Sequence, residues 1–280
     1  MAFNPDFSSP RNGAEILLRD LVFEKTGLFF DETKLDIFTG KISHLLAQRG
    51  FSSYLDYYYL LKYDADSAHE WSNVIDTLAV QETYFWREMD QINALSDEVI
   101  PFLLSKNPRT PIRIWSAACA TGEEPLTIAM RLNEDGWFQR ADITLFATDA
   151  SPAAITRARA GLYGGRSFRA LSEPLKAKYF SPEGKHWRVS SDLQRRISYG
   201  LANLVEPSST DPYSRGNVIF CRNVFIYFSL ATIRDVVESF AEKIEVPGFL
   251  FVGASESLLK ATDRFELEEI GSAFVYAKRK

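Results

Sequence analysis

The segment 112–134 constrains the fold most, because a strand pattern, a small-residue loop and a helical pattern follow one another without a break. The strand pattern reads IRIWSA, the loop ACATG and the helical pattern EEPLTIAMRLNE. Pro125 falls in the first helical turn, where its missing N–H costs little. The order repeats at 143–163, where ITLFATD precedes a helical pattern with Ser151 as the expected N-cap and Pro152 as its first residue.

Further strand patterns follow at 197–204, 217–223, 248–255 and 273–279, and a helix is expected at 230–245 after the cap Ser229. Strands that alternate with helices predict an α/β fold, a doubly wound and mostly parallel sheet with helices on both faces. The stretch 176–200 breaks this alternation. Its segments HWRVSS and RRISYG surround a polar turn and predict a small antiparallel β insertion.

The region before this sheet carries helical patterns and no strand-like alternation. One helix face is predicted from the spacing of five apolar residues, with Gly50 as the stop signal: Leu35, Phe38, Ile42, Leu45 and Leu46. We therefore expect a small all-helical domain over 1–90, a linker helix and connection over 91–111, and the α/β domain over 112–280.

Composition and charge exclude several classes of protein. The chain has 280 residues, is 46% hydrophobic and has two cysteines and three histidines. No apolar run reaches the roughly 18 residues of a membrane span, and the polar N-terminus lacks a signal-peptide pattern. Residues 1–90 carry 8 Lys+Arg against 15 Asp+Glu, and 91–280 carry 24 against 22, without a basic stripe for nucleic acid. We expect a cytoplasmic protein with reduced thiols and no structural metal.

The loop after the first strand indicates the class of ligand. Ligands of doubly wound sheets bind beyond the carboxyl ends of the strands. A dinucleotide site would need several glycines there, whereas this loop has only Gly122, and Glu123 and Glu124 would repel phosphate at the helix start. S-adenosylmethionine (SAM) has no phosphate and is cationic, and Asp149 at the next strand end can accept its ribose hydroxyls. Alternatively, the two glutamates complement the helix dipole and Asp149 forms a turn.

Five motifs together resemble the CheR-type chemotaxis methyltransferases. They are VQETYFWRE, WSAACATGEEP, LFATDASPAAITRARAGLY, LANLVE and IFCRNVFIYF. The resemblance extends from about residue 15 to 278, and it is ordered as in that family: helical domain, linker, and SAM-dependent methyltransferase (Rossmann-like) domain with a β insertion. It implies a protein-glutamate O-methyltransferase that forms methyl esters on the cytoplasmic signalling domain of chemoreceptors, with S-adenosylhomocysteine as the product.

The resemblance also implies residue roles. Arg87 and Tyr227 are the expected catalytic residues, Arg87 orienting the substrate carboxylate and Tyr227 standing near the transferred methyl group. Because a glutamate with a pKa of about 4.3 is already ionised at neutral pH, we expect neither a metal nor a general base. The expected cofactor-binding residues are Gln81, Thr83, Arg87, Glu124, Asp149, Asn203, Leu204, Arg222 and Asn223.

The sequence departs from the family in ways that bear on substrate recognition. Gln81 stands where asparagine is frequent, and Tyr84 and Trp86 differ from the commoner residues, a change expected to have no chemical consequence. Only SPEGKHW separates Phe180 from Arg188, so we expect no tethering to a receptor's C-terminal peptide. Two basic clusters are docking candidates for acidic receptor helices: Lys34, Lys41 and His44 with Gln48, and Lys185, Arg188, Arg195 and Arg196.

Two alternatives stay open on the sequence. A methyltransferase of the same fold could act on a small molecule or a different signalling protein. The acidic helical domain and the short insertion loop are the features that favour this alternative. A non-catalytic SAM-sensing module is the other, although Arg87, Asn223 and Tyr227 argue for catalysis.

Overall fold

The computed structural model describes residues 13–65 and 67–280, which form two compact units. The first comprises the described part of Met1–Val80 together with Tyr227–Thr232, and the second comprises Gln81–Ile226 and Ile233–Lys280. The segment 81–90, expected in the helical domain, thus lies in the second unit.

The first unit is built from four helices around their own apolar core. They are α1 (Ala14–Thr26), α2 (Leu35–Arg49), α3 (Tyr54–Tyr63) and α4 (Ser67–Leu78). The predicted face of α2 is confirmed, because all five of its apolar residues are buried, and the helix ends at Gly50 with a φ of 81°. Inside this unit the Phe29 N–H donates to the Tyr227 carbonyl at 2.8 Å, and Leu28 forms an antiparallel bridge with Phe228.

The second unit contains a seven-stranded sheet in the order β6-β2-β1-β7-β8-β10-β9. All neighbouring strands pair in parallel except β10, which is antiparallel to both β8 and β9. The strands are β1 (Ile112–Ala117), β2 (Ile143–Asp149), β6 (Ile197–Leu201), β7 (Val218–Cys221), β8 (Gly248–Phe251), β9 (Glu266–Ile270) and β10 (Ala273–Lys278). The chain runs from β1 to β2 on one side and later fills β7 on the other, so the strand order reverses at β1.

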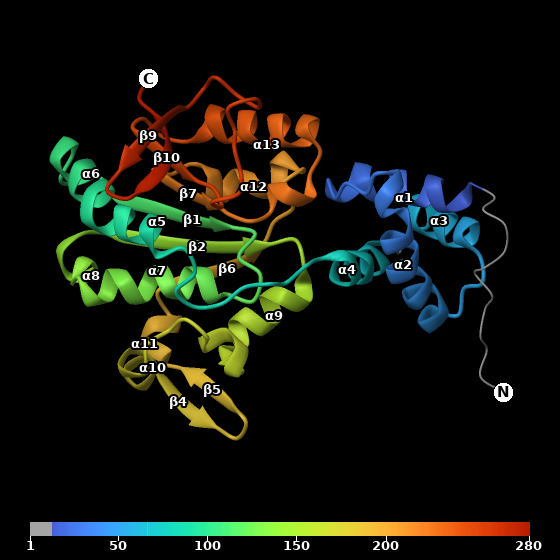
Figure 1. Cartoon of the computed structure of the whole chain (residues 1–280), viewed down its shortest axis with the longest axis horizontal. Helices are drawn as coiled ribbons and strands as arrows, with labels where there is room; N and C mark the ends of the chain where they lie inside the picture. Colours follow the sequence, from blue (N-terminus) through green and yellow to red (C-terminus); the bar gives the residue numbers. More distant parts are fainter. Residues whose placement is uncertain (1–12, 66) are drawn as a thin grey trace. The chain divides into compact units, whose positions relative to one another are not determined.

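Helices cover both faces of this sheet, as predicted. Figure 1 shows α12 and α13 on one face and α7 on the other. The Trp115 ring packs 5.4 Å from Phe240 of α13, while Ile114 points into the core on the opposite face. The helices are α5 (Met89–Ala94), α6 (Ile100–Lys106), α7 (Glu123–Glu134), α8 (Trp137–Arg140), α9 (Pro152–Ala160), α10 (Glu173–Tyr179), α11 (Ser191–Gln194), α12 (Pro207–Ser214) and α13 (Leu230–Lys243).

The segment expected to be a linker packs into the core of the second unit. A π-helical stretch, Leu95–Val99, joins α5 to α6, so the backbone is helical from 89 to 106. Ile92, Leu95 and Ile100 are buried in the same cluster as the strands β1 and β8. Their apolar face therefore makes this helix a covering layer of the sheet.

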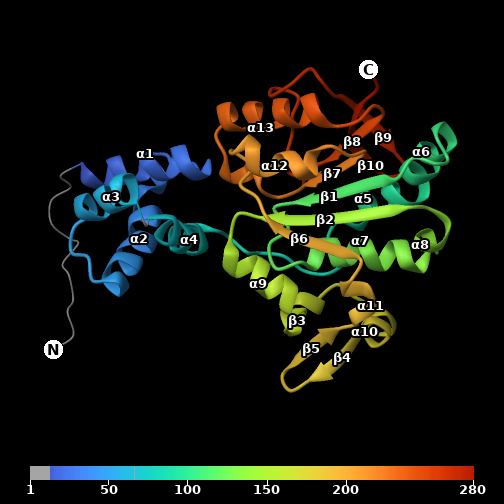
Figure 2. The same ribbon diagram turned by 180° about the vertical axis from the view of Figure 1, so that it is seen from behind.

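The β insertion differs from the expected one in its extent, because it spans 162–189 instead of 176–200. It is a three-stranded antiparallel sheet in the order β3-β5-β4, with β3 (Leu162–Tyr163), β4 (Phe180–Glu183) and β5 (His186–Val189). Figure 2 shows it apart from the main sheet, beside α10 and α11. The segment RRISYG was wrongly placed in it, because Ile197–Leu201 forms β6 and pairs in parallel with β2. The edge strand β9 was not predicted, since its sequence ELEEI is acidic and pairs only with β10.

Candidate functional site

Strained backbone gathers at one end of the main sheet. Among the described residues, five other than glycine have a positive φ, and all lie just before α5 or directly after β1 or β7: Trp86, Glu88, Ala118, Ala120 and Asn223. Such conformations cost free energy and persist only where surrounding contacts hold them, and they often mark functional sites. The carboxyl ends of β1 and β7 are thus the candidate site, together with the end of β2, which pairs with β1.

The loop after β1 is fixed by backbone contacts on both sides. The Cys119 N–H donates to the Thr148 carbonyl at 2.8 Å, and the Tyr163 hydroxyl donates to the Thr121 carbonyl at 3.0 Å. Gly122 has a φ of 95°, and a Cβ there would lie 3.0 Å from the Tyr163 hydroxyl. This explains why the loop has its glycine at this position.

Asp149 binds the backbone of two loops. Its Oδ2 accepts the Ala120 N–H and its Oδ1 accepts the Ser151 N–H, both at 2.9 Å. The turn role weighed from the sequence is therefore real, and Ser151 also caps α9 by accepting the Ala154 N–H. Asp149 therefore joins the loop after β1 to the start of α9.

The two acids at the start of α7 have different partners. Glu123 accepts the hydroxyls of Thr121 and Ser167 at 2.6 and 2.8 Å, and it therefore holds the loop. Glu124 accepts the Ser116 hydroxyl at 2.7 Å and lies 3.3 Å from the Arg222 guanidinium. Burial raises the pKa of Glu124, against the opposing effect of Arg222.

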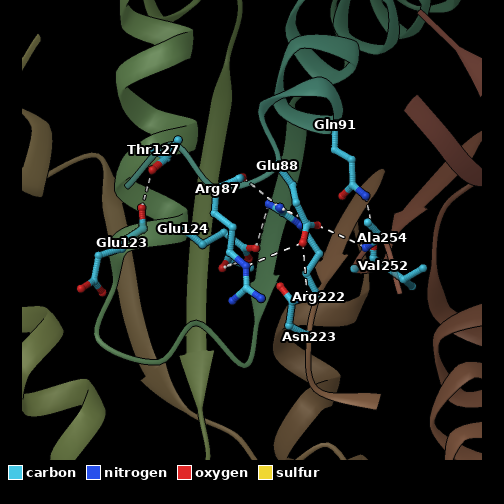
Figure 3. A network of polar contacts seen from close by, with 12 residues as sticks. Arg87, Glu88, Gln91, Glu123, Glu124, Thr127, Arg222, Asn223, Val252 and Ala254 are labelled. Atoms are coloured by element: carbon cyan, nitrogen blue, oxygen red, sulfur yellow. Dashed lines mark hydrogen bonds and ion pairs between the residues drawn. The ribbon is translucent and has the colours of Figure 1, made fainter. Parts of the chain in front are cut away.

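Arg222 is the centre of a buried polar network, drawn in Figure 3. Its side chain is 2% exposed, and its Nη2 donates to the Arg87 carbonyl at 2.9 Å and to Glu88 at 3.0 Å. Burial by itself would raise the pKa of Glu88, but Arg222 and the hydrogen bonds to Glu88 outweigh it, so the pKa lies below its usual value. Glu88 also accepts the Asn223 side-chain amide at 3.4 Å and the Ala254 N–H at 3.3 Å.

Two acidic residues of this region, Glu88 and Glu256, were missed from the sequence. Glu256 accepts three backbone N–H groups, from Asn223 at 2.8 Å, Gly253 at 2.6 Å and Ile226 at 3.3 Å. It therefore joins the loops that follow β7 and β8. Glu88 had a weak signal, as a neighbour of Arg87 in a motif, whereas Glu256 lies in an unremarkable loop segment, GASES.

The Arg87 side chain is held by contacts within its own segment. Its Nη1 donates to the Glu82 carbonyl at 3.0 Å, and its Nε lies 3.7 Å from Glu88. The side chain is still 26% exposed, so the guanidinium can meet a substrate. Thr83 lies half-buried on the same segment.

The remaining expected cofactor residues lie around β2. Gln81 donates to the Ser151 hydroxyl and accepts the Arg157 guanidinium, both at 3.2 Å. The loop after β6 is joined to β2, because the Ala202 N–H donates to the Asp149 carbonyl at 3.1 Å. In that loop Asn203 accepts the Val205 N–H at 3.3 Å, and Leu204 is buried.

The structure thus brings Arg87, Glu124, Arg222 and Asn223 into one network, and it places Gln81, Asp149, Asn203 and Leu204 around the end of β2. Tyr227 belongs to the other compact unit.

Several of the basic docking candidates are engaged within their own unit. The Lys41 ammonium donates to the Leu78 carbonyl at 3.1 Å, and burial lowers its pKa. Arg188 pairs with Glu183, and Arg195 pairs with Asp192. His44 and Gln48 are exposed on α2.

Residues 13–65 and 67–280 contain neither a cluster of metal-ligating side chains nor a helix that could span a membrane. In these residues no three His, Cys, Asp or Glu side chains come together in a way that could hold a metal ion. In the same part of the chain, every helix is too short or too polar to span a membrane.

Comparison with known proteins identifies the family. Residues 16–79 match the all-alpha domain of CheR methyltransferases, and 81–274 match their SAM-binding domain. The chain belongs to the CheR methyltransferase family. It is 32% identical to chemotaxis protein methyltransferase 2 of Vibrio cholerae over 93% of this chain and 91% of that protein. It is also 28% identical to chemotaxis protein methyltransferase 1 of Pseudomonas aeruginosa over 94% of this chain and 97% of that protein.

The family membership makes the protein a SAM-dependent methyltransferase of chemotaxis. The residues fit that cofactor. Among the described residues the buried Arg222 Nε–H has no acceptor, and it can donate to the carboxylate of the methionine moiety. Glu88 and Glu124 lie beside Arg222, and Asp149 lies at the end of β2.

Proposed function

We propose that this protein transfers a methyl group from SAM to glutamate side chains of chemoreceptors and forms methyl esters. The names of the relatives support a chemotaxis substrate. The observation that carries the proposal is the partly exposed guanidinium of Arg87. The backbone carbonyl of the same residue accepts a hydrogen bond from the buried Arg222. A cation held in this way can orient an incoming carboxylate by a charge-assisted hydrogen bond.

The proposed roles follow from the network. Glu124, Arg222 and Asn223 would hold the methionine part of the cofactor, Asp149 and Gln81 the ribose side, and Asn203 and Leu204 the adenine. Thr83 would lie on the cofactor side of the segment that carries Arg87.

The chemistry requires alignment rather than proton transfer. Bound SAM supplies an electrophilic methyl group, so that an O–C bond forms at the substrate carboxylate while the C–S bond breaks and the electron pair stays on sulfur. The carboxylate is ionised at neutral pH, so no residue has to remove a proton. Arg87 orients the carboxylate, and the buried network keeps the arginine in place, which is a proximity contribution.

The experiment is transfer of radiolabelled methyl groups from SAM to receptor-rich membranes of the native source. Wild type is compared with Arg87→Ala and Asp149→Ala, and with Arg264→Gln as a control at an exposed ion pair. We expect base-labile label on a receptor-sized band, at least tenfold weaker in both site variants and unchanged in the control. If calorimetry shows that SAM binds but no receptor band is labelled, the proposed substrate is wrong and the cofactor assignment stands.

A further inference from the structure

Tyr84, a residue that differs from the family pattern, lies between two arginines of the second unit. The Arg169 Cζ is 3.7 Å from the centroid of the Tyr84 ring, and the Arg87 Cζ is 5.7 Å from it. Both distances are in the range of cation–π contacts. The Tyr84 ring thus links Arg87 to a second cation.

The segment that carries Tyr84 is anchored to the chain around Arg169. The Phe85 N–H donates to the Ser167 carbonyl at 2.9 Å, and the fully buried Phe85 ring packs 5.2 Å from Phe168. Tyr84 thus lies on the outer side of a segment whose next residue is in the core. The two guanidiniums are held in a defined arrangement.

The partner of Arg169 is an exposed carboxylate of the same segment. Glu82 lies 2.6 Å from Arg169, and the two side chains are 66% and 42% exposed. An exposed ion pair of this kind contributes little to stability and exchanges readily with other carboxylates. The Glu82 carbonyl, in contrast, binds Arg87 at 3.0 Å through the backbone, and this contact does not depend on the side chain.

We propose that Arg169 binds an acidic residue of the substrate beside the glutamate that Arg87 receives, with Tyr84 aligning the two cations and Glu82 occupying Arg169 in the free protein. This proposal rests on the proposed function. Side chains one helical turn apart lie about 5–6 Å from each other at Cβ. Two cations beside one aromatic ring therefore suit a helix with a second acid three or four residues from the methylated glutamate.

The experiment measures methyl transfer to a purified receptor cytoplasmic fragment, with SAM affinity measured separately by calorimetry. Arg169→Gln is expected to raise KM for the fragment about three- to fivefold, with kcat and SAM affinity unchanged. Glu82→Gln is expected to lower KM about twofold, because it releases Arg169. Tyr84→Leu should raise KM, and Tyr84→Phe should retain the wild-type value.

The control is Arg264→Gln, which removes an exposed arginine paired with Glu238 elsewhere in the same unit and outside both basic clusters. The decisive result is a rise of KM in Arg169→Gln together with a fall of KM in Glu82→Gln. An ion pair with a structural role alone would change KM in the same direction in both variants. Equal KM values in Arg169→Gln and the control would overturn the docking role while transfer by wild type continues. Absence of transfer by wild type would overturn the proposed function, and the docking role with it.

Discussion

At the scale of single residues, the site depends on carboxylates that bind backbone N–H groups. Glu256 is the clearest case, because one side chain accepts from Asn223, Gly253 and Ile226. Asn223 has a φ of 59°, a conformation that needs such support. A Cβ at Gly253 would lie 2.5 Å from the Asn223 side chain, so the two loops are also closely packed.

Replacement of Glu256 by glutamine should therefore destabilise the site. Glutamine keeps one acceptor oxygen, so the substitution is expected to lower the free energy of unfolding by about 1–3 kcal/mol and to weaken SAM binding. Urea unfolding and calorimetry measure the two effects. Glu183→Gln, at an exposed ion pair of the insertion, is the matched control and should change both by little. Equal stability of the two variants would contradict the role of Glu256.

The contributions of Glu88 and Glu124 to the free energy of unfolding should depend on pH in opposite directions. The pKa of Glu88 is lowered in the folded protein, so its contribution is present above its unfolded pKa near 4.5 and is lost as pH falls through the lower folded value. The pKa of Glu124 is raised, so its contribution is present below 4.5 and is lost as pH rises through the higher folded value.

Unfolding curves measured at several pH values test this pair. Compared with wild type, Glu88→Gln should lose less stability as the pH falls below 4.5. Glu124→Gln should lose less stability as the pH rises above 4.5. Parallel curves for wild type and both variants would refute the opposite shifts.

At the scale of elements, the loop between β1 and α7 sets the shape of the site. Its glycine combines a positive φ with close packing against Tyr163 and Ala158. The sequence predicted the strand, the loop and the helix at their observed positions. It did not predict that Glu123 holds the loop while Glu124 faces Arg222, because adjacent helical residues point in different directions and only their packed neighbours decide the partners.

Gly122→Ala should accordingly impair both stability and binding. A Cβ would meet the Tyr163 hydroxyl and the Ala158 Cβ at 3.0 Å, in addition to the backbone strain at a φ of 95°. We expect a loss of about 1–3 kcal/mol of stability and a weaker SAM affinity. Gly50→Ala is the control, since Gly50 has a φ of 81° but open space around the added Cβ. It should cost stability without changing SAM affinity.

At the scale of the whole molecule, two separate apolar cores define two units. The first core contains Phe38, Tyr57 and Val74, and the second contains Ile114, Met130 and Phe220. The chain crosses between the units near residue 80 and on both sides of Tyr227–Thr232. The helical unit thus includes a short segment from late in the sequence, which carries the candidate residue Tyr227.

Hydrogen exchange with and without SAM should separate the units. Ligand binding stabilises by about 2.7 kcal/mol when the ligand concentration is 100 times Kd. We expect this added protection in the loops after β1, β2 and β7, where the cofactor residues lie. Amides in the cores of α2 and α4 should serve as the internal control and change little. Equal added protection in α2 and α4 would contradict placement of the cofactor site in the second unit.

The sequence by itself determined the class of fold and most elements of the parallel sheet. Short apolar strands that alternate with amphipathic helices can bury their apolar side chains in few arrangements other than a sheet covered by helices. For this reason β1, β2, α7 and α9 were predictable. The family motifs also indicated the cofactor. Edge elements were harder. The strand β9 gains little from burial, and the start of β6 was assigned both to the main sheet and to the insertion, because its pairing partner is not visible in the sequence.

Only the tertiary structure decided the partners of the charged side chains. Glu88, Glu124 and Arg222 are far apart in the sequence, and they meet because parallel strands end at one edge of the sheet. The same holds for Arg87, Tyr84 and Arg169, which packing of Phe85 and Phe168 brings together. Local patterns record burial and backbone propensity, whereas an ion pair depends on distances between segments that only the folded chain fixes.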